Sequence, residues 1–215
     1  MTSIAYPKIQ IKQMKKVLLI IFVMNISLLL QAQIHFGVNA AANSSTVKIQ
    51  NDLYKCHARV GVALGVFSRY DLNASLALQG EIDYSAEGGK WTRASTKGVI
   101  KESLLRIPVL LQYKTAKGLF LEAGPAYNMM LSFKESVDGD PATDEKDNME
   151  SGVFGYGIGA GYAFSGPLSG LRANIRFNGD LSPINKVEGG STKATNHLIR
   201  FAFYYDLGKS GGSKK

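Results

Sequence analysis

The sequence predicts an all-β protein, an eight-stranded antiparallel up-and-down transmembrane β-barrel. Three observations indicate it: segments that alternate apolar and polar side chains, one nearly unbroken apolar face, and short turns that alternate with long polar loops. Period-two alternation is typical of a strand with two different faces. The alternating segments are roughly ten residues long, which is about the length of a tilted strand that crosses a membrane.

The N-terminal stretch, residues 1–32, has the features of a cleaved secretory signal peptide. Lys15 and Lys16 precede an apolar run over 17–30, and a small residue follows near the expected cleavage site. The run is short for a membrane helix and contains two polar residues, which favours a cleaved signal over a retained anchor. Met14 stands directly before the basic pair and is an alternative start of the chain.

Composition limits the classes of function. The chain has 25 basic and 17 acidic residues, and residues 1–32 contribute four of the basic ones and none of the acidic ones. The remainder therefore carries a net charge of +4 rather than +8. It has no Lys- or Arg-rich run with interleaved aromatic residues, which argues against nucleic acid as a partner. Cys56 is the one cysteine, so an intrachain disulfide is excluded.

The first three strands are predicted at 34–42, 58–70 and 74–85. In each strand the apolar residues face outward, and small or polar residues face inward. The charged inward residues of these strands are Arg59, Arg69, Glu81 and Asp83. A three-residue turn at 71–73 would place Gly61 opposite Asp83 and Ala63 opposite Glu81. Small residues opposite large ones are how a narrow barrel accommodates its inward side chains.

The next two strands form a hairpin over 104–131. Gln112 and Glu122 fall on the same face only if the loop between the strands has three residues and ends in Gly118. This is a favoured hairpin form, with glycine at the position that needs a positive φ. The turn chemistry and the facial pattern therefore support the same register, in which Gln112 lies opposite Glu122.

The last three strands are predicted at 151–164, 170–180 and 197–207. The inward row of the first consists of Gly155, Gly157, Gly159 and Gly161. Such a row is unfavourable in a soluble strand, but it leaves space for arginine side chains from neighbouring strands. The charged inward residues of the other two strands are Arg172, Arg176, Asp180, Arg200 and Asp206.

The connections differ in length at the two ends of the predicted barrel. Short turns fall near 71–73, 116–118 and 166–169, and long polar loops fall near 43–57, 86–102, 133–150 and 181–196. Barrels of the bacterial outer membrane have this asymmetry, with an even number of strands, short periplasmic turns and long external loops. The predicted location is therefore the cell outer membrane.

An interior ion-pair network follows from closing the sheet. A strand protein in hydrocarbon must pair every backbone donor and acceptor, and eight strands enclose a lumen that side chains can fill. A lone buried charge is costly, whereas a hydrogen-bonded network is tolerable. The predicted network residues are Arg59, Glu81, Asp83, Arg106, Glu122, Arg172, Arg176 and Arg200. We interpret the network as a structural polar plug, with a proton or ion path as the less favoured interpretation.

Residues for catalysis or metal binding are few. His35, His57 and His197 lie far apart, and no Ser-His-acid set is brought together by the predicted strands, so neither an enzyme nor a cofactor is expected. The 133–150 loop is acidic, and Asp138, Asp140 and Asp144 are weak candidates for divalent-ion ligands. The later ligand spacing and the central glycine of a calcium loop are missing there, so a solvated loop is favoured.

The two charged loops are the candidate contact surfaces. The 86–102 loop is basic and surrounds Trp91, so it could contact lipid phosphates or an acidic patch on a protein. The 133–150 loop is the second candidate surface for a protein partner. We expect a monomer whose apolar outer face contacts outer-membrane lipid.

Several segments of the sequence resemble the PorT-like outer-membrane β-barrel proteins. The resemblance lies in Gly37-Val38-Asn39, Gln79-Gly80-Glu81-Ile82-Asp83-Tyr84-Ser85, Arg106-Ile107-Pro108-Val109-Leu110-Leu111-Gln112-Tyr113, Leu121-Glu122-Ala123-Gly124-Pro125 and Gly155-Tyr156-Gly157-Ile158-Gly159-Ala160-Gly161-Tyr162. It covers nearly the whole chain after the signal. The resemblance implies an eight-stranded outer-membrane barrel with a mostly undefined role, and some relatives take part in protein secretion.

One departure from that family concerns the C-terminus. Such barrels often end on an aromatic residue, whereas this chain continues past Tyr205 to Lys215. We therefore divide the chain into a signal peptide at 1–32, a barrel at 33–208 and a polar periplasmic tail at 209–215.

The expected function is a non-enzymatic outer-membrane barrel with a side-chain-filled lumen. Its role would be structural, in the envelope, or an interaction made by its loops, and the family resemblance adds a link to secretion. The alternative is a secreted, soluble, calycin-like barrel that binds a small apolar ligand. In that case the apolar face would line a cavity and the Arg and Glu side chains would meet water.

Overall fold

The computed structural model describes residues 34–186 and 192–207; the predicted signal peptide at 1–32 and the polar tail at 209–215 lie outside them. No helix in these described ranges is long and apolar enough to cross a membrane. The strands are β1 (Ile34–Ile49), β2 (Lys55–Asp71), β3 (Leu76–Arg93), β4 (Thr96–Lys114), β5 (Leu119–Val137), β6 (Thr143–Asp144), β7 (Gly152–Ala163), β8 (Leu171–Asp180) and β9 (Ala194–Asp206). Two 3-10 turns, η1 (Lys146–Asn148) and η2 (Gly166–Leu168), lie in the connections.

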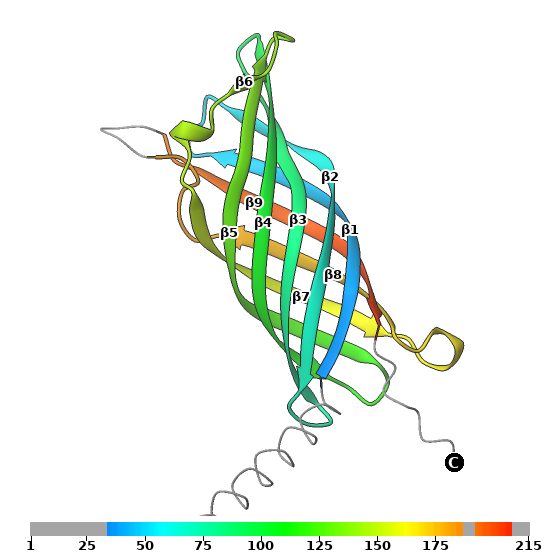
Figure 1. Ribbon diagram of the computed structural model, residues 1–215. Helices are drawn as coiled ribbons and strands as arrows, with labels where there is room; N and C mark the ends of the chain where they lie inside the picture. Colours follow the sequence, from blue (N-terminus) through cyan, green and yellow to red (C-terminus); the bar gives the residue numbers. More distant parts are fainter. Residues whose placement is uncertain (1–33, 187–191, 208–215) are drawn as a thin grey trace, which may run out of the picture. The chain divides into compact units, whose positions relative to one another are not determined.

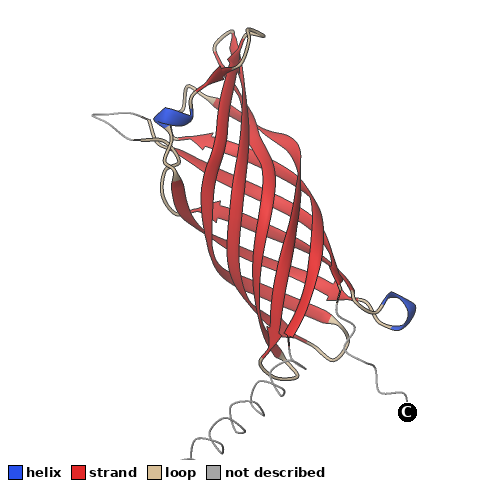
Figure 2. Ribbon diagram, viewed as in Figure 1, coloured by secondary structure: helices blue, strands red, loops and turns tan. Residues whose placement is uncertain are grey.

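Eight of these strands form a closed ring. The hydrogen-bonded order runs β4-β3-β2-β1-β9-β8-β7-β5, and the pairing of β4 with β5 joins its two ends. Figures 1 and 2 show the strands tilted around a single barrel. The two-residue strand β6 pairs with β5 at Lys134 and Glu135 and is not part of the ring. The predicted eight-stranded antiparallel barrel is therefore confirmed.

Most of the large apolar side chains of the ring face outward. Leu64 and Phe154 are 63% and 64% exposed, whereas Glu81 and Arg176 are 2% and 1% exposed. Alternation along each strand thus separates an apolar outer face from a polar inner one. The calycin-like alternative is wrong, because it needs the apolar face inside and the charged face in water.

The hairpin from β4 to β5 has the predicted register. Gln112 is paired with Glu122, and the Thr115 N–H donates to the Leu119 carbonyl over 2.8 Å. Gly118 has a φ of +87°, a left-handed conformation in which a side chain would be strained. The parity argument from the sequence is confirmed at this turn.

The hairpin from β2 to β3 differs from the predicted register. Its connection spans residues 72–75, so Asp83 lies opposite Gly65 instead of Gly61. Glu81 lies opposite Phe67 instead of Ala63. The reason is the Asn73 side chain, whose Oδ1 accepts the backbone N–H groups of residues 75 and 76, both over 2.8 Å. This Asx turn lengthens the loop and shifts the pairing of the two strands. Because the shift is an even number of residues, the same residues of each strand still face inward.

Two of the predicted long loops are mostly strand. β1 continues to Ile49, and the connection of β3 to β4 is only residues 94–95, so most of the predicted 43–57 and 86–102 loops is wrong. β5 likewise continues to Val137, into the predicted 133–150 loop. The outward positions of these extensions are mostly polar, and their inward positions mix polar with apolar residues, which is why they resembled loops in the sequence. Figure 1 shows β3, β4 and β5 rising beyond the other strands at the end where β6 lies.

The strand lengths explain this polar extension. Crossing a bilayer needs only about 9–11 residues of tilted strand, whereas β4 has 19. On β4 the outward positions change from apolar Val109 and Leu111 to exposed Lys101 and Lys97. The charged part of the strand therefore suits water, and the barrel wall continues past its apolar belt. We call the end that carries β6 the loop end and the opposite end the turn end.

Candidate functional site in the barrel lumen

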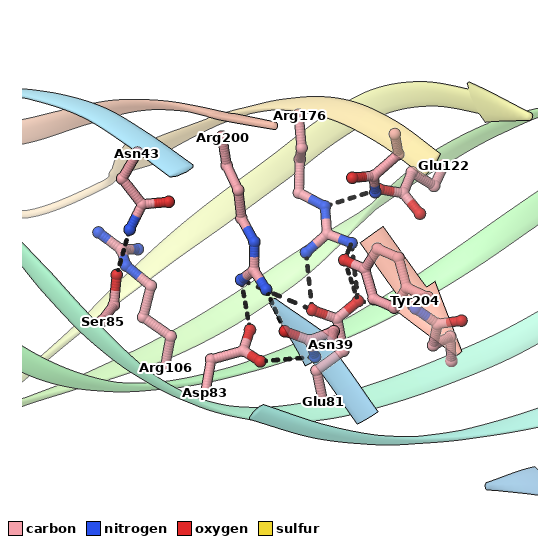
Figure 3. A network of polar contacts seen from close by, with 12 residues as sticks. Asn39, Asn43, Glu81, Asp83, Ser85, Arg106, Glu122, Arg176, Arg200 and Tyr204 are labelled. Atoms are coloured by element: carbon pink, nitrogen blue, oxygen red, sulfur yellow. Dashed lines mark hydrogen bonds and ion pairs between the residues drawn. The ribbon is translucent and has the colours of Figure 1, made fainter. Parts of the chain in front are cut away.

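Arg176 on β8 is the centre of the buried network. Its Nε donates to Glu122 Oε1 over 2.6 Å, and its Nη1 and Nη2 donate to both carboxylate oxygens of Glu81 over 3.0 and 2.7 Å. Nη2 also donates to the Tyr204 hydroxyl over 3.0 Å. Figure 3 shows these groups converging across the lumen from β3, β5, β8 and β9. One guanidinium therefore connects strands from different sides of the ring, in the bidentate geometry that suits arginine.

Arg200 on β9 forms the neighbouring pair. It donates from Nη1 to Asp83 and from Nη2 to Asn39 Oδ1, the latter over 2.6 Å. Asn39 in turn donates from Nδ2 to Asp83 Oδ1 over 2.9 Å, which closes a triangle between β1, β3 and β9. The glycine at position 65 makes room for this triangle, because a Cβ there would lie 1.9 Å from Asp83 Oδ1. We call Arg176, Arg200, Glu81, Asp83 and Glu122 the central group.

A second set of acids lies toward the loop end. Arg106 donates to Glu87 from Nε over 2.5 Å and from Nη2 over 2.7 Å. Glu102 lies directly opposite Glu87 on β4 and accepts one hydrogen bond, from Asn196 Nδ2 over 2.7 Å. Its Oε1 is buried without a hydrogen-bond partner among the described residues. We call Glu87, Glu102, Asp180 and Arg106 the loop-side group.

The structure brings most of the predicted network residues together. Glu81, Asp83, Arg106, Glu122, Arg172, Arg176 and Arg200 are all buried in the lumen. Arg172 donates to Gln79 Oε1 over 2.8 Å and lies over the Phe67 ring, 4.8 Å from its centroid, so it is held partly by a cation–π contact. Arg59 is the exception: it is half-buried, and its Nη1 donates to the backbone carbonyl of Glu87 over 2.7 Å. Arg59 is therefore not part of the carboxylate network.

Sequence reasoning missed Glu87 and Glu102. Both were assigned to the predicted 86–102 loop, yet both continue the inward parity of the strands that contain them: Glu87 follows Asp83 and Ser85, and Glu102 precedes Leu104. The alternation of inward and outward positions therefore continues along the strands beyond the point at which the outward residues stop being apolar. Following the inward positions alone would have found both carboxylates.

The glycine row of β7 provides the predicted space for Arg176. A Cβ at Gly157 would lie 3.1 Å from Arg176 Cδ, and a Cβ at Gly159 would lie 3.2 Å from Arg176 Cβ. Gly161 leaves space for an aromatic ring instead, because a Cβ at this position would lie 2.3 Å from Phe120 Cζ. The row is thus filled from the neighbouring strands, by an arginine and by a phenylalanine.

The weak metal candidates do not assemble. Asp138 Oδ1 accepts the Lys97 N–H over 2.8 Å, and Asp144 Oδ1 accepts the Lys146 N–H over 3.0 Å. Both carboxylates therefore stabilise turns, and Asp140 is exposed. Within residues 34–186 and 192–207 no group of three or more His, Cys, Asp or Glu side chains is arranged to hold a metal ion.

The three histidines are also apart. His35 on β1 lies 3.5 Å from Asp71 Oδ2, and His197 on β9 stacks on Phe177 with ring centroids 5.9 Å apart. His57 is exposed on β2. These positions give no common centre for acid–base chemistry.

An apolar layer covers the network toward the loop end. Its buried members are Val47, Trp91, Ile100, Leu104, Met130, Phe133, Val153 and Ile184. Ile100 and Leu104 flank Glu102 on the inner face of β4, so the layer overlaps the loop-side group along this strand. The lumen is therefore polar in its centre and apolar at one end.

A comparison of the sequence with models of protein families identifies its family. Residues 24–185 match the model of the family described as outer membrane protein beta-barrel domain. The chain belongs to this family. It is located in the outer membrane, as the sequence predicted. A comparison with curated proteins found no match.

The chain is similar to several solved structures, three of which come from Yersinia, Neisseria and Pseudomonas. The Ail attachment invasion locus protein of Yersinia pestis is 12% identical, with a TM-score of 0.47 over 81% of this chain and 99% of that one. Neisserial surface protein A is 15% identical, with a TM-score of 0.49 over 80% of this chain and 97% of that one. OprG from Pseudomonas aeruginosa is 13% identical, with a TM-score of 0.42 over 81% of this chain and 95% of that one.

Proposed function

We propose that this protein is a non-enzymatic, non-conducting outer-membrane barrel that acts as a monomer and presents its loop end to a protein partner. Its apolar outer face would contact the membrane lipid. The observation that carries the proposal is the central group, in which Arg176 is joined to both Glu81 and Glu122 across the lumen.

The energetics of this group favour a closed lumen. A conducting path would need water and ions where Arg176, Glu81 and Glu122 now contact one another. Separating one partner of a buried ion pair typically costs about 3–5 kcal/mol, because the remaining charge is left unpaired. Each carboxylate of the central group has an arginine partner, so opening the path would break several such contacts at once.

The loop end supports the second half of the proposal. β3, β4 and β5 extend there with exposed Lys90, Lys97 and Lys101, and the chain after β5 is acidic. A wall of paired strands holds these charges in a fixed arrangement, which lowers the entropy lost when a partner binds. The resemblance to PorT-like proteins supports a partner from a protein-secretion system.

Conductance in planar bilayers tests the closed lumen. The wild-type barrel should give no discrete current steps, and Glu122→Gln should lower the unfolding temperature, again without current. Glu150→Gln, at an exposed carboxylate of the loop end, is the matched control and should leave the unfolding temperature unchanged. Steady single-channel conductance of the folded wild type would overturn the plug.

Site-specific photo-crosslinking in intact cells tests the partner. A crosslinker at Lys97 or Lys101 should give a defined protein adduct, and one at Lys117, in the turn between β4 and β5, should not. An adduct with a secretion component would establish that link. Identical adducts from both ends, or none from the loop end, would refute presentation by the loop end.

A further inference from the structure

The loop end of the lumen contains a pocket of about 310 Å³. Its apolar walls come from β1, β4, β5 and the connection of β8 to β9, at Val47, Ile100, Phe133 and Ile184. Leu104, Met130 and Val153 continue the apolar layer to which these walls belong. A cavity of this size with mostly apolar walls and a few polar groups is typical of a small-molecule site.

Trp91 is held in the wall of this pocket by three contacts. Its Nε1–H donates to Glu135 Oε1 over 2.6 Å, and the Tyr54 ring meets it edge-to-face with centroids 5.3 Å apart. Gly98, its cross-strand neighbour, leaves the space that the indole fills, since a Cβ there would lie 2.1 Å from Trp91 Cε2. The aromatic surface is therefore fixed in place before any ligand arrives.

The charged side chains that line the pocket are both acidic. They are Glu135 on β5 and Glu145 beside η1, and no lysine, arginine or histidine is among the lining residues. In the described part of the chain neither carboxylate is in an ion pair within 4.0 Å. Glu135 holds the indole N–H, and Glu145 Oε2 accepts from Asn148 Nδ2 over 2.6 Å. The pocket is thus apolar, aromatic and anionic.

We propose that this pocket binds a small organic cation with an apolar or aromatic body, such as a hydrophobic primary amine. The ammonium group would lie at Glu135 and Glu145 and beside the Trp91 ring, which attracts cations. The Tyr54 ring already has a cation, because the Arg93 guanidinium lies 5.4 Å from its centroid. The body of the molecule would fill the apolar space above the loop-side group. This inference goes beyond the proposed function, because it concerns a ligand at the loop end and does not depend on whether the lumen conducts.

The protein contains its own probe for this test. Trp91 is the single tryptophan of the chain and lines the pocket, so fluorescence of the folded barrel in detergent, excited at a wavelength that tyrosine does not absorb, reports on it alone. Titration with 2-phenylethylammonium should give a saturable change. The neutral analogue 2-phenylethanol should bind at least about tenfold more weakly, since it lacks the charge that the carboxylates and the Trp91 ring attract. The anion 3-phenylpropanoate should give no saturable change.

Two variants separate recognition of the cation from mere filling of an apolar space. Glu135→Gln keeps an acceptor for the indole and should weaken 2-phenylethylammonium about tenfold while leaving 2-phenylethanol unchanged. Ala194→Phe should fill the pocket and abolish both titrations. Glu150→Gln, which removes an exposed charge outside the pocket lining, should change neither.

Three results would overturn the proposal. They are equal binding of the amine and the alcohol, no saturation with the amine, and unchanged amine affinity in Glu135→Gln. Each can occur with a lumen that does not conduct, so failure here is distinguishable from failure of the plug.

Discussion

The central group and the loop-side group lie on the same inward face but differ in how their charges are compensated. Every carboxylate of the central group has an arginine partner: Glu81 and Glu122 pair with Arg176, and Asp83 pairs with Arg200. In the loop-side group Glu87 pairs with Arg106. Among the described residues Glu102 and Asp180 have only amide donors, from Asn128 and Asn196.

The difference shows that a buried carboxylate in this lumen does not contribute to stability merely by being buried; its contribution depends on whether it has an arginine partner. The attraction between a buried carboxylate and its arginine partner offsets desolvation of the two charges, whereas a carboxylate without a cation carries an uncompensated desolvation cost. This contrast supports our proposal that the central group closes the lumen, and it predicts that the loop-side group contributes less to stability.

The largest expected effect is on the central group. Arg176→Met should lower the free energy of unfolding by about 3–5 kcal/mol, because it leaves Glu81 and Glu122 buried without their cation. Urea titration of the barrel in lipid vesicles, read by the shift in gel migration between folded and unfolded forms, measures it. Arg93→Met, at an exposed arginine, is the matched control.

Should Arg176→Met not fold at all, Arg176→Met/Glu81→Gln/Glu122→Gln should recover folding, since it removes the stranded charges together with the arginine. A loss of less than about 1 kcal/mol in the single variant would mean that the two groups do not differ as described.

A steric change should have an intermediate effect. Gly157→Val should cost about 1–3 kcal/mol, because its side chain would displace Arg176 and Asn178, which would lie 3.1 and 3.0 Å from the new Cβ. Ile158→Val, at the adjacent outward position, is the control and should cost far less. The same urea titration compares them, and equal costs at both positions would contradict the crowding of Arg176 by β7.

Removing the Tyr204 hydroxyl, which is hydrogen-bonded to the central group, should have a smaller effect. Tyr204 donates to Glu81 and accepts from Arg176, so Tyr204→Phe should cost about 0.5–1.5 kcal/mol, the usual net value of a hydrogen bond. Tyr205→Phe, on the exposed face of the same strand, should have no measurable effect. A larger loss in Tyr205→Phe than in Tyr204→Phe would reverse the assignment of the two faces of β9.

The smallest expected effect is a small gain in stability, or none, rather than a loss. Glu102→Gln should leave stability unchanged or raise it by up to about 1 kcal/mol, because the amide keeps an acceptor for Asn196 and removes a charge that has no cation. Glu81→Gln in the same titration should destabilise. Matching losses in the two variants would show that Glu102 is compensated as well as Glu81 is.

The sequence predicted the barrel because period-two alternation and turn chemistry act locally. Gln112 and Glu122 share a face through Gly118, and the inward parity of Arg176 and Arg200 follows from the same rule. Partner identity could not be predicted in this way. Arg200 reaches Asp83 across the lumen, because β1 and β2 lie between β9 and β3 in the closed ring, and this contact depends on the whole barrel.

The residues that the sequence did not place correctly were misassigned for physical reasons. Polar residues near Glu87 and Glu102 resembled a loop because strands outside hydrocarbon no longer need an apolar outer face. Arg59 was assigned to the network by parity, but β2 has a register shift between Ala58 and Ala63, which parity cannot anticipate. The pocket was missed for the same reason as Glu87, since Trp91 and Ile100 lie on the strand extensions.

The reach of the central contacts has a consequence for assembly. Arg200 and Asp83 are 117 residues apart in the sequence, and Arg176 and Glu81 are 95 apart. An N-terminal sheet that inserts ahead of the last strands would hold Glu81 and Asp83 with no counter-ion, in surroundings that penalise them. Half-built intermediates are thus disfavoured, and insertion should be an all-or-none event that completes only when the final strand arrives.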